Sequence, residues 1–181
     1  QPRRSVIVSR RGSYHGAAYG ATSVSGIPEL KRGIGPTLPG VVEVEPPDCA
    51  RCPFGQRPPA CGLQCAKAVE AALERLDGGA AAFIAEPVCA AGRVQVPPDG
   101  YWPRVARAVR AAGALLILDE VLTGMGRTGT WFAAEHWDLR PDLLVLGKGL
   151  AGGCAPIGAV LISAGVAETF RGRALDHGYT F

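Results

Sequence analysis

The chain has 181 residues, which is enough for one domain with a sizeable core and too few for two large ones. Hydrophobic residues make up 48% of the chain and charged residues 19%, a composition that excludes an intrinsically disordered protein. The formal charge is only +3 and the basic residues are scattered, so we expect no nucleic-acid partner. Because no apolar run is long enough to cross a bilayer, we expect no membrane partner either.

Four of the six cysteines form the pattern C-x2-C-x8-C-x3-C between Cys49 and Cys65. Closely spaced thiolates of this kind could close a tetrahedral zinc site. The spacing between the two pairs is short for a zinc ribbon, however, and Pro53, Pro58 and Pro59 stiffen the loop that joins them. We therefore predict no metal site. Reduced cysteines without a secretory signal favour a cytoplasmic protein.

The first half of the chain contains two predicted strands and one predicted helix. Ser5–Ser9 (SVIVS) and Gly40–Glu45 (GVVEVE) are rich in β-branched residues, which favours strands. Between them lies Gly12–Gly16, an aromatic pair enclosed by glycines. Apolar residues recur at helical spacing over Leu63–Leu76, so this segment is predicted to be an amphipathic helix that ends at Gly78.

The second half alternates apolar strands with helical segments. Ala80–Ala85 (AAAFIA), Ala114–Leu118 (ALLIL) and Leu143–Leu146 have no polar side chain, which indicates buried strands. Tyr101–Ala112 is predicted to be a helix, and Gly113 is the expected signal for its end. Two further elements are a strand over Ile157–Ser163 and the start of a helix within Gly165–Phe170.

Buried strands separated by helices predict an α/β fold with a mostly parallel sheet covered on both faces. Ligands of such sheets bind beyond the carboxyl ends of the strands. Three predicted strands are followed at that end by ionisable residues, which are Glu86, Asp119 and Lys148. The sequence therefore points to a site at this edge of the sheet.

Lys148 lies between two glycines, directly after a buried strand. A lysine in such a place is a candidate for a lowered pKa, and hence for a nucleophilic amine. Flanking glycines would let a bulky planar group approach the backbone. The alternative is a surface lysine in a glycine-rich turn.

Asp119 ends the neighbouring strand, where its carboxylate could hold a pyridinium N–H and keep such a ring protonated. The alternatives are a helix cap or a structural ion pair with Arg127. Tyr14 offers an aromatic face between glycines.

Leu116–Gly129 (LILDEVLTGMGRTG), Pro141-Asp142, Gly147–Gly149 and Pro156–Val160 (PIGAV) together resemble the class III pyridoxal-phosphate aminotransferases. The resemblance covers nearly the whole chain, and its most specific block runs from Asp119 to Lys148. Weaker matches are Ser13–Gly16 (SYHG), Glu86-Pro87, Pro97–Tyr101 (PPDGY) and His177–Thr180 (HGYT).

The resemblance implies a role for each matching residue. Lys148 would bind the cofactor aldehyde covalently and then move a proton during the reaction. Asp119 would pair with the pyridine nitrogen. Tyr14 would stack on one face of the ring and Val121 on the other.

Further cofactor-binding residues are implied by the same motifs. His15 and Gly16 follow Tyr14 in its motif, and Glu86 would lie near the cofactor in a supporting role. Thr180 would bind the cofactor phosphate of a neighbouring subunit in a homodimer. Leu122 stands where many family members carry a polar residue, so the ring hydroxyl is given no partner here.

The resemblance implies fold type I, with residues 1–181 as part of the large, cofactor-binding domain. Family members are well over twice this length, so we expect a fragment without the N-terminal segment and the C-terminal small domain. The expected activity moves an amino group between an amine or amino acid and a 2-oxo acid or aldehyde. Alternatives are decarboxylation, amino-group migration or phospho-elimination with the same cofactor, or a non-catalytic fragment. The isolated chain is expected to be inactive.

Overall fold

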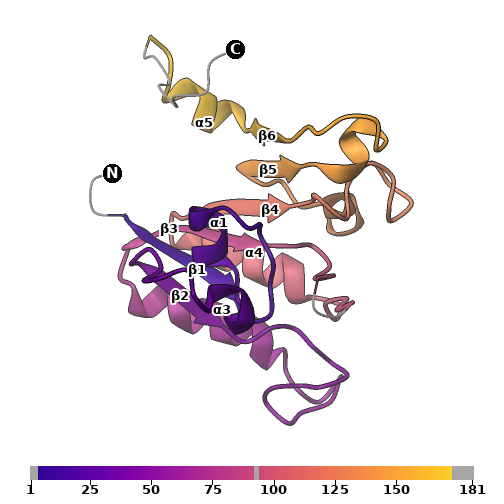
Figure 1. Cartoon of the computed structure of the whole chain (residues 1–181). Helices are drawn as coiled ribbons and strands as arrows, with labels where there is room; N and C mark the ends of the chain where they lie inside the picture. Colours follow the sequence, from indigo (N-terminus) through magenta and orange to yellow (C-terminus); the bar gives the residue numbers. More distant parts are fainter. Residues whose placement is uncertain (1–3, 92–93, 173–181) are drawn as a thin grey trace.

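The computed structural model describes residues 4–91 and 94–172, and Figure 1 shows their arrangement. Within these residues six strands form one sheet in the order β2-β1-β3-β4-β5-β6. The strands are β1 (Val6–Arg10), β2 (Val41–Val44), β3 (Ala80–Ala85), β4 (Leu115–Asp119), β5 (Leu143–Leu146) and β6 (Ala159–Ile162).

The sheet is mostly parallel, as the sequence predicts. Strands β1 to β5 pair with their neighbours in parallel, and β6 pairs with β5 in the antiparallel direction. Strands β3, β4 and β5 lie side by side, with Leu118 opposite both Ala85 and Leu144. Their carboxyl ends therefore meet at one edge of the sheet, where ligands of α/β proteins bind.

Two long helices, α3 (Gln64–Arg75) and α4 (Tyr101–Ala111), pack against each other and against the sheet (Figure 1). Helix α3 buries Ala66, Val69 and Leu73, whose spacing places them on one side of a helix. These side chains share one core with residues of the strands and of α4. The strands contribute Val8, Phe83, Leu116, Leu118 and Leu144, and α4 contributes Trp102, Val105 and Val109.

The other face of the sheet is less covered within the described residues. Ile84, Ile117 and Val145 are only partly buried there. The edge strand β6 exposes apolar side chains, because Val160 is 56% and Leu161 50% accessible to solvent.

Several short elements complete the described chain. Helices α1 (Tyr19–Val24) and α2 (Pro28–Lys31) lie between β1 and β2, and α5 (Ala164–Glu168) follows β6. Short 3-10 helices span Ala133–Trp137 and Lys148–Ala151. No helix in the described ranges is long and apolar enough to cross a membrane.

Candidate active site

A cavity of about 400 Å³ lies at the carboxyl ends of β3, β4 and β5. Glu86, Asp119 and Lys148, which follow or end these strands, all line it. The cavity thus joins residues far apart in the sequence. Every predicted binding residue that the structure describes lines this cavity, namely Tyr14, His15, Gly16, Glu86, Asp119, Val121 and Lys148. Thr180 lies outside the described residues.

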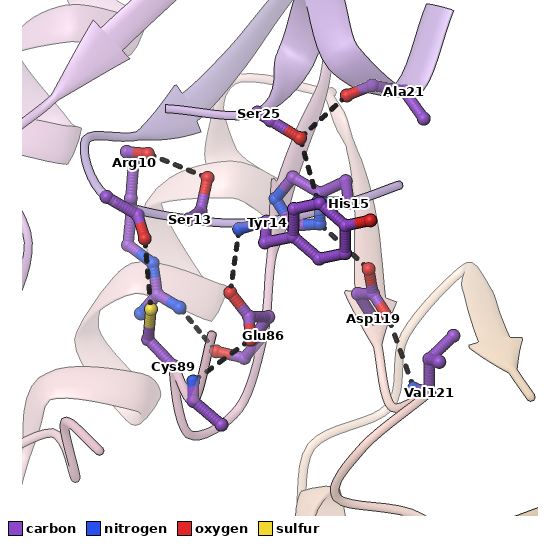
Figure 2. Close-up of polar contacts among 12 residues, drawn as sticks. Arg10, Ser13, Tyr14, His15, Ala21, Ser25, Glu86, Cys89, Asp119 and Val121 are labelled. Atoms are coloured by element: carbon purple, nitrogen blue, oxygen red, sulfur yellow. Dashed lines mark hydrogen bonds and ion pairs between the residues drawn. The ribbon is translucent and has the colours of Figure 1, made fainter. Parts of the chain in front are cut away.

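Asp119 is held from two sides, as Figure 2 shows. Its Oδ2 atom lies 2.9 Å from Nδ1 of His15, and its Oδ1 atom accepts a hydrogen bond of 3.1 Å from the backbone N–H of Val121. The side chain of His15 is only 2% exposed and that of Asp119 only 9%. The alternative ion pair between Asp119 and Arg127 is not formed. The buried His15 is the side-chain partner of Asp119 instead.

The backbone of His15 is positioned by Ser25, which sequence reasoning missed. The N–H of His15 donates to the Ser25 hydroxyl at 2.8 Å, and this hydroxyl donates in turn to the carbonyl of Ala21 (Figure 2). The next residue, Gly26, lies so close to β1 that a Cβ atom there would be 2.1 Å from the Arg10 carbonyl oxygen. Gly26 therefore allows the contact that brings Ser25 beneath His15.

The Glu86 carboxylate joins two backbone segments at the cavity. Its Oε1 atom accepts a hydrogen bond of 3.1 Å from the N–H of Tyr14, and its Oε2 atom accepts one of 3.1 Å from the N–H of Ala90. Glu86 is 5% exposed, so these two donors replace much of its lost hydration. The carboxylate thereby fixes the position of the Tyr14 backbone, from which the aromatic side chain extends.

Arg10 supports Glu86 from inside the core. It is 1% exposed and donates a hydrogen bond to the Glu86 backbone carbonyl. Its guanidinium lies 5.6 Å from the centre of the Trp102 ring, and Trp102 donates to the Pro87 carbonyl at 3.0 Å. The Glu86-Pro87 segment is thus held by hydrogen bonds from two side chains that form a cation–π pair with each other.

Lys148 lies in the left-handed backbone region, with φ at 44°, and its side chain is exposed at the cavity. The structure adds a reason for the glycines beside it. A Cβ on Gly147 would lie 3.3 Å from a methyl of Val121, and one on Gly149 would lie 3.2 Å from Cβ of Met125. The flanking glycines therefore let the 121–125 segment pack closely against the lysine turn.

Glu120 fixes the segment that follows Asp119. It is 1% exposed, and its carboxylate accepts hydrogen bonds from the backbone N–H groups of Ala133 and Ala134 at 2.7 and 2.8 Å. The Thr123 hydroxyl also donates to it at 2.9 Å. In the sequence, the one signal for Glu120 is that an acidic residue directly follows Asp119 at a strand end. The sequence alone does not show that the Glu120 side chain points inward.

The residues around the cavity fit the pyridoxal group that the sequence resemblance implies. Each oxygen of Asp119 has one protein donor, so lone pairs remain for a ring N–H. Lys148 supplies an amine, and Tyr14 and Val121 supply apolar wall. Leu122, Thr123, Val88 and Ala91 also line the cavity and had been given no binding role from the sequence.

The cysteine cluster lies away from this cavity, in the loop between β2 and α3. Cys65 is buried in the first turn of α3, and burial is the main cause that raises the pKa of its thiol to about 11. Burial, followed by the charges of Cys61 and Cys52, also raises the pKa of Cys49. Among residues 4–91 and 94–172, no three His, Cys, Asp or Glu side chains are placed to hold a metal ion.

Among curated proteins, the chain is 38% identical over 98% of its length to leucine/methionine racemase of Thermococcus litoralis. It is 35% identical over 100% of its length to putrescine–pyruvate aminotransferase of Pseudomonas aeruginosa. The chain spans 40% of the length of each of these relatives.

Several solved structures are similar to this chain in both fold and sequence. An (S)-enantioselective omega-transaminase from Thermomicrobium roseum superposes with a TM-score of 0.93 at 43% identity, over 99% of this chain and 41% of that one. An amine transaminase from an uncultivated Pseudomonas species, in its PLP-bound form, gives a TM-score of 0.94 at 38% identity, over 99% and 42%. The family model for class III aminotransferases matches residues 1–181. The chain therefore belongs to the class III aminotransferase family, and its sheet is that of the fold type I large domain.

Proposed function

We propose that the protein to which this chain belongs transfers an amino group from an amine or amino acid to a 2-oxo acid or aldehyde, with pyridoxal phosphate as cofactor. The observation that carries this proposal is the meeting of Asp119 and Lys148 at one cavity, from the ends of two paired strands. The family and the PLP-bound neighbour support the choice of cofactor.

Pyridoxal phosphate supplies an electron-withdrawing ring that stabilises negative charge on the substrate carbon. Asp119 would bind the ring N–H, and His15 and the Val121 amide would keep its carboxylate in place. Tyr14 and Val121 would enclose the ring. Lys148 Nζ would bind the aldehyde and would then act as the base that moves a proton between the substrate Cα and the C4′ carbon of the cofactor.

The supporting contacts have a clear purpose in this proposal. Glu86 holds the Tyr14 amide, and Arg10 holds the Glu86 carbonyl, so the aromatic wall is anchored to the core. Rigid positioning of reacting groups can contribute roughly 7–11 kcal/mol to catalysis. The network from Arg10 to Tyr14 would serve this positioning.

We propose further that the active protein is a homodimer in which Thr180 binds the cofactor phosphate of the neighbouring subunit. Lys148 is the one lysine or arginine among the described residues that line the cavity. A phosphate dianion would therefore need groups from beyond these residues. Because the chain spans only 40% of the length of the two curated relatives, residues 1–181 expressed alone should give no sustained amino transfer, even with the cofactor added.

A different reaction with the same cofactor is the second candidate, because one relative is a racemase. Racemisation also begins with proton removal at Cα, and Asp119 and Lys148 would serve it equally. The two reactions differ in whether a 2-oxo acid is consumed.

The proposal is tested on the full-length protein that contains this chain. After loading with pyridoxal phosphate and borohydride reduction, peptide mapping should place the pyridoxyl group on Lys148. A label on Lys31 or Lys67 instead would refute the assignment. With 1-phenylethylamine and pyruvate, alanine should form in step with acetophenone.

Two other outcomes point elsewhere. Interconversion of L- and D-amino acids without any loss of pyruvate would favour the racemase. A chain that takes no label and forms no product would favour a non-catalytic protein.

A further inference from the structure

The loop between β2 and α3 holds four thiols that the proposed amino transfer does not use. Cys49 is exposed, Cys52 and Cys61 are partly buried, and Cys65 is buried in the first turn of α3. None of them is among the described residues that line the cavity at Lys148. The cysteine cluster therefore has to be explained by its own geometry and chemistry.

Cys49 and Cys61 act on each other although eleven residues separate them in the sequence. Burial is the main cause that raises the pKa of Cys49, and the charge of Cys61 comes next, ahead of the charges of Cys52 and Asp48. Burial is also the main cause for Cys65, whose pKa the charges of Cys49 and Cys61 both raise. Because such effects fall off with distance, the thiols of Cys49 and Cys61 lie close together.

Cys49 stands at a fixed point where the loop begins. The preceding residue, Asp48, is 7% exposed. Its Oδ1 atom accepts a hydrogen bond of 2.9 Å from the N–H of Arg51, and its Oδ2 atom accepts one of 3.0 Å from Nε2 of Gln95. Cys49 lies between two backbone positions that this carboxylate joins, so its backbone is held while the residue itself is exposed.

Cys61 stands at a second fixed point, where the loop ends. Its N–H donates to the Arg57 carbonyl at 3.1 Å. Two residues later, the Leu63 carbonyl accepts hydrogen bonds of 2.9 and 3.0 Å from the N–H groups of Ala66 and Lys67, which begin α3. The Leu63 side chain packs against the core. A bond from Cys61 to the start of the loop would thus join two anchored points.

We propose that Cys49 and Cys61 form a reversible disulfide when the protein meets a soluble disulfide such as oxidised glutathione. The thiolate of one cysteine attacks a sulfur of oxidised glutathione, which breaks the S–S bond and releases one glutathione thiolate. The thiolate of the other cysteine then attacks the first cysteine's sulfur and releases the second glutathione. The two protons and two electrons of the cysteine thiols thereby end on two molecules of reduced glutathione. This inference does not depend on the proposed amino transfer.

The test uses the full-length protein, incubated with reduced or oxidised glutathione, blocked with N-ethylmaleimide and digested with trypsin. Cleavage after Arg51 places Cys49 in the peptide of residues 33–51 and Cys61 in that of residues 52–67. Oxidised glutathione should link these two peptides in protein that runs as a single chain on a non-reducing gel. Dithiothreitol should release them, since the bond is a disulfide.

Three cysteines share the second peptide, so serine variants identify the partner of Cys49. Cys61→Ser should abolish the link and leave glutathione bound to Cys49. Cys52→Ser, in the same peptide and equally half-buried, is the matched control and should keep the link. A link that is lost in Cys52→Ser and kept in Cys61→Ser would overturn the proposed pair.

A labelling experiment on the wild-type protein covers the case in which a variant does not fold. After treatment with oxidised glutathione, the maleimide should no longer label Cys49 and Cys61, and it should label Cys52 as in the reduced protein. Glutathione that stays on Cys49 of the wild type would overturn the inference, because it would show that Cys61 does not reach the mixed disulfide. Full labelling of both Cys49 and Cys61 would overturn it as well.

Discussion

Nδ1 of His15 lies 2.9 Å from Oδ2 of Asp119, and both side chains are almost fully buried at the wall of the cavity. The two residues are joined across the sheet, from the segment after β1 to the end of β4. Because Val121 holds the other oxygen, the carboxylate of Asp119 has one fixed orientation. Its charge and its direction can therefore be tested separately.

Asp119→Asn should preserve the shape of the site and remove the charge. An amide cannot keep a pyridine ring protonated as a carboxylate can, so kcat should fall on the order of 100-fold or more. Cofactor retention, measured by absorbance after dialysis, should fall much less. His15→Phe is the companion variant: it keeps the charge, loosens the carboxylate, and should reduce kcat less than Asp119→Asn. Near-normal turnover of Asp119→Asn would mean that the residue is only a structural cap.

Gly149→Ala should destabilise the lysine turn, because the new Cβ would lie 3.2 Å from Cβ of Met125. Crowding of this kind costs about 1–3 kcal/mol, which thermal unfolding of the full-length protein can measure. Met125→Gly in the same chain should restore part of the loss, since it removes the neighbour and relieves the positive φ of 60° at that position. Gly20→Ala, whose nearest neighbour would be 3.9 Å away, is the control and should not lower the midpoint. Equal effects of the two alanine variants would refute this packing argument.

Glu70 and Arg104 join α3 to α4 through two hydrogen bonds of 2.6 Å each. The hydrogen bond from Arg104 is the main cause that lowers the pKa of Glu70, against the opposing effect of burial. A lowered carboxyl pKa contributes stability above its unfolded-state value, near 4.5, that is lost as pH falls through the folded value.

Glu70→Gln should therefore lower the free energy of unfolding at pH 7 by about 0.5–1 kcal/mol, a small value because both side chains are partly exposed. The difference from wild type should shrink below pH 4.5. Glu29→Gln, in an exposed pair with Arg32, should change nothing. A difference that grows towards acid would contradict the assigned sign.

The strands were predictable because fully buried strands appear as short apolar runs between glycines and prolines. Ala80–Ala85 and Leu143–Leu146 have the predicted bounds, and the strand over Ala114–Leu118 is displaced by one residue. Helix α1 was missed because Tyr19–Val24 consists mainly of small and polar residues without apolar periodicity. Its place depends on contacts with β1 and not on its own sequence pattern.

The site was predictable where a residue follows a strand, since parallel strands bring their ends together. Asp119 and Lys148 obey this rule, and the structure places both at one cavity. Ser25 obeys no local rule: it reaches His15 because Gly12 and Gly26 pair through a backbone hydrogen bond of 2.8 Å. Arg10 ends a strand as well, but its inward direction depends on the buried Trp102 ring beneath it.

The four clustered cysteines should bind no stoichiometric zinc. The loop that carries them contains three prolines that stiffen it, and the spacing between the two cysteine pairs is short for a zinc ribbon. Metal analysis of the purified full-length protein should give far less than one zinc per chain. A zinc content near one, lost together with thermal stability on Cys52→Ser, would overturn this prediction.

The Cys65 thiol should react with iodoacetamide much more slowly than the exposed Cys49 and Cys154. Thiolate is the reactive form, and a pKa of about 11 leaves only about one Cys65 in a thousand ionised at pH 8. Burial in the first turn of α3 also blocks the approach of the reagent. Cys154 is exposed in the turn after Lys148 and should be labelled first. Peptide mass spectrometry over a time course at pH 8 gives the order, and 6 M guanidinium should remove the difference by unfolding the chain. Early labelling of Cys65 in the folded protein would show that the start of α3 opens in solution and that its burial does not protect the thiol.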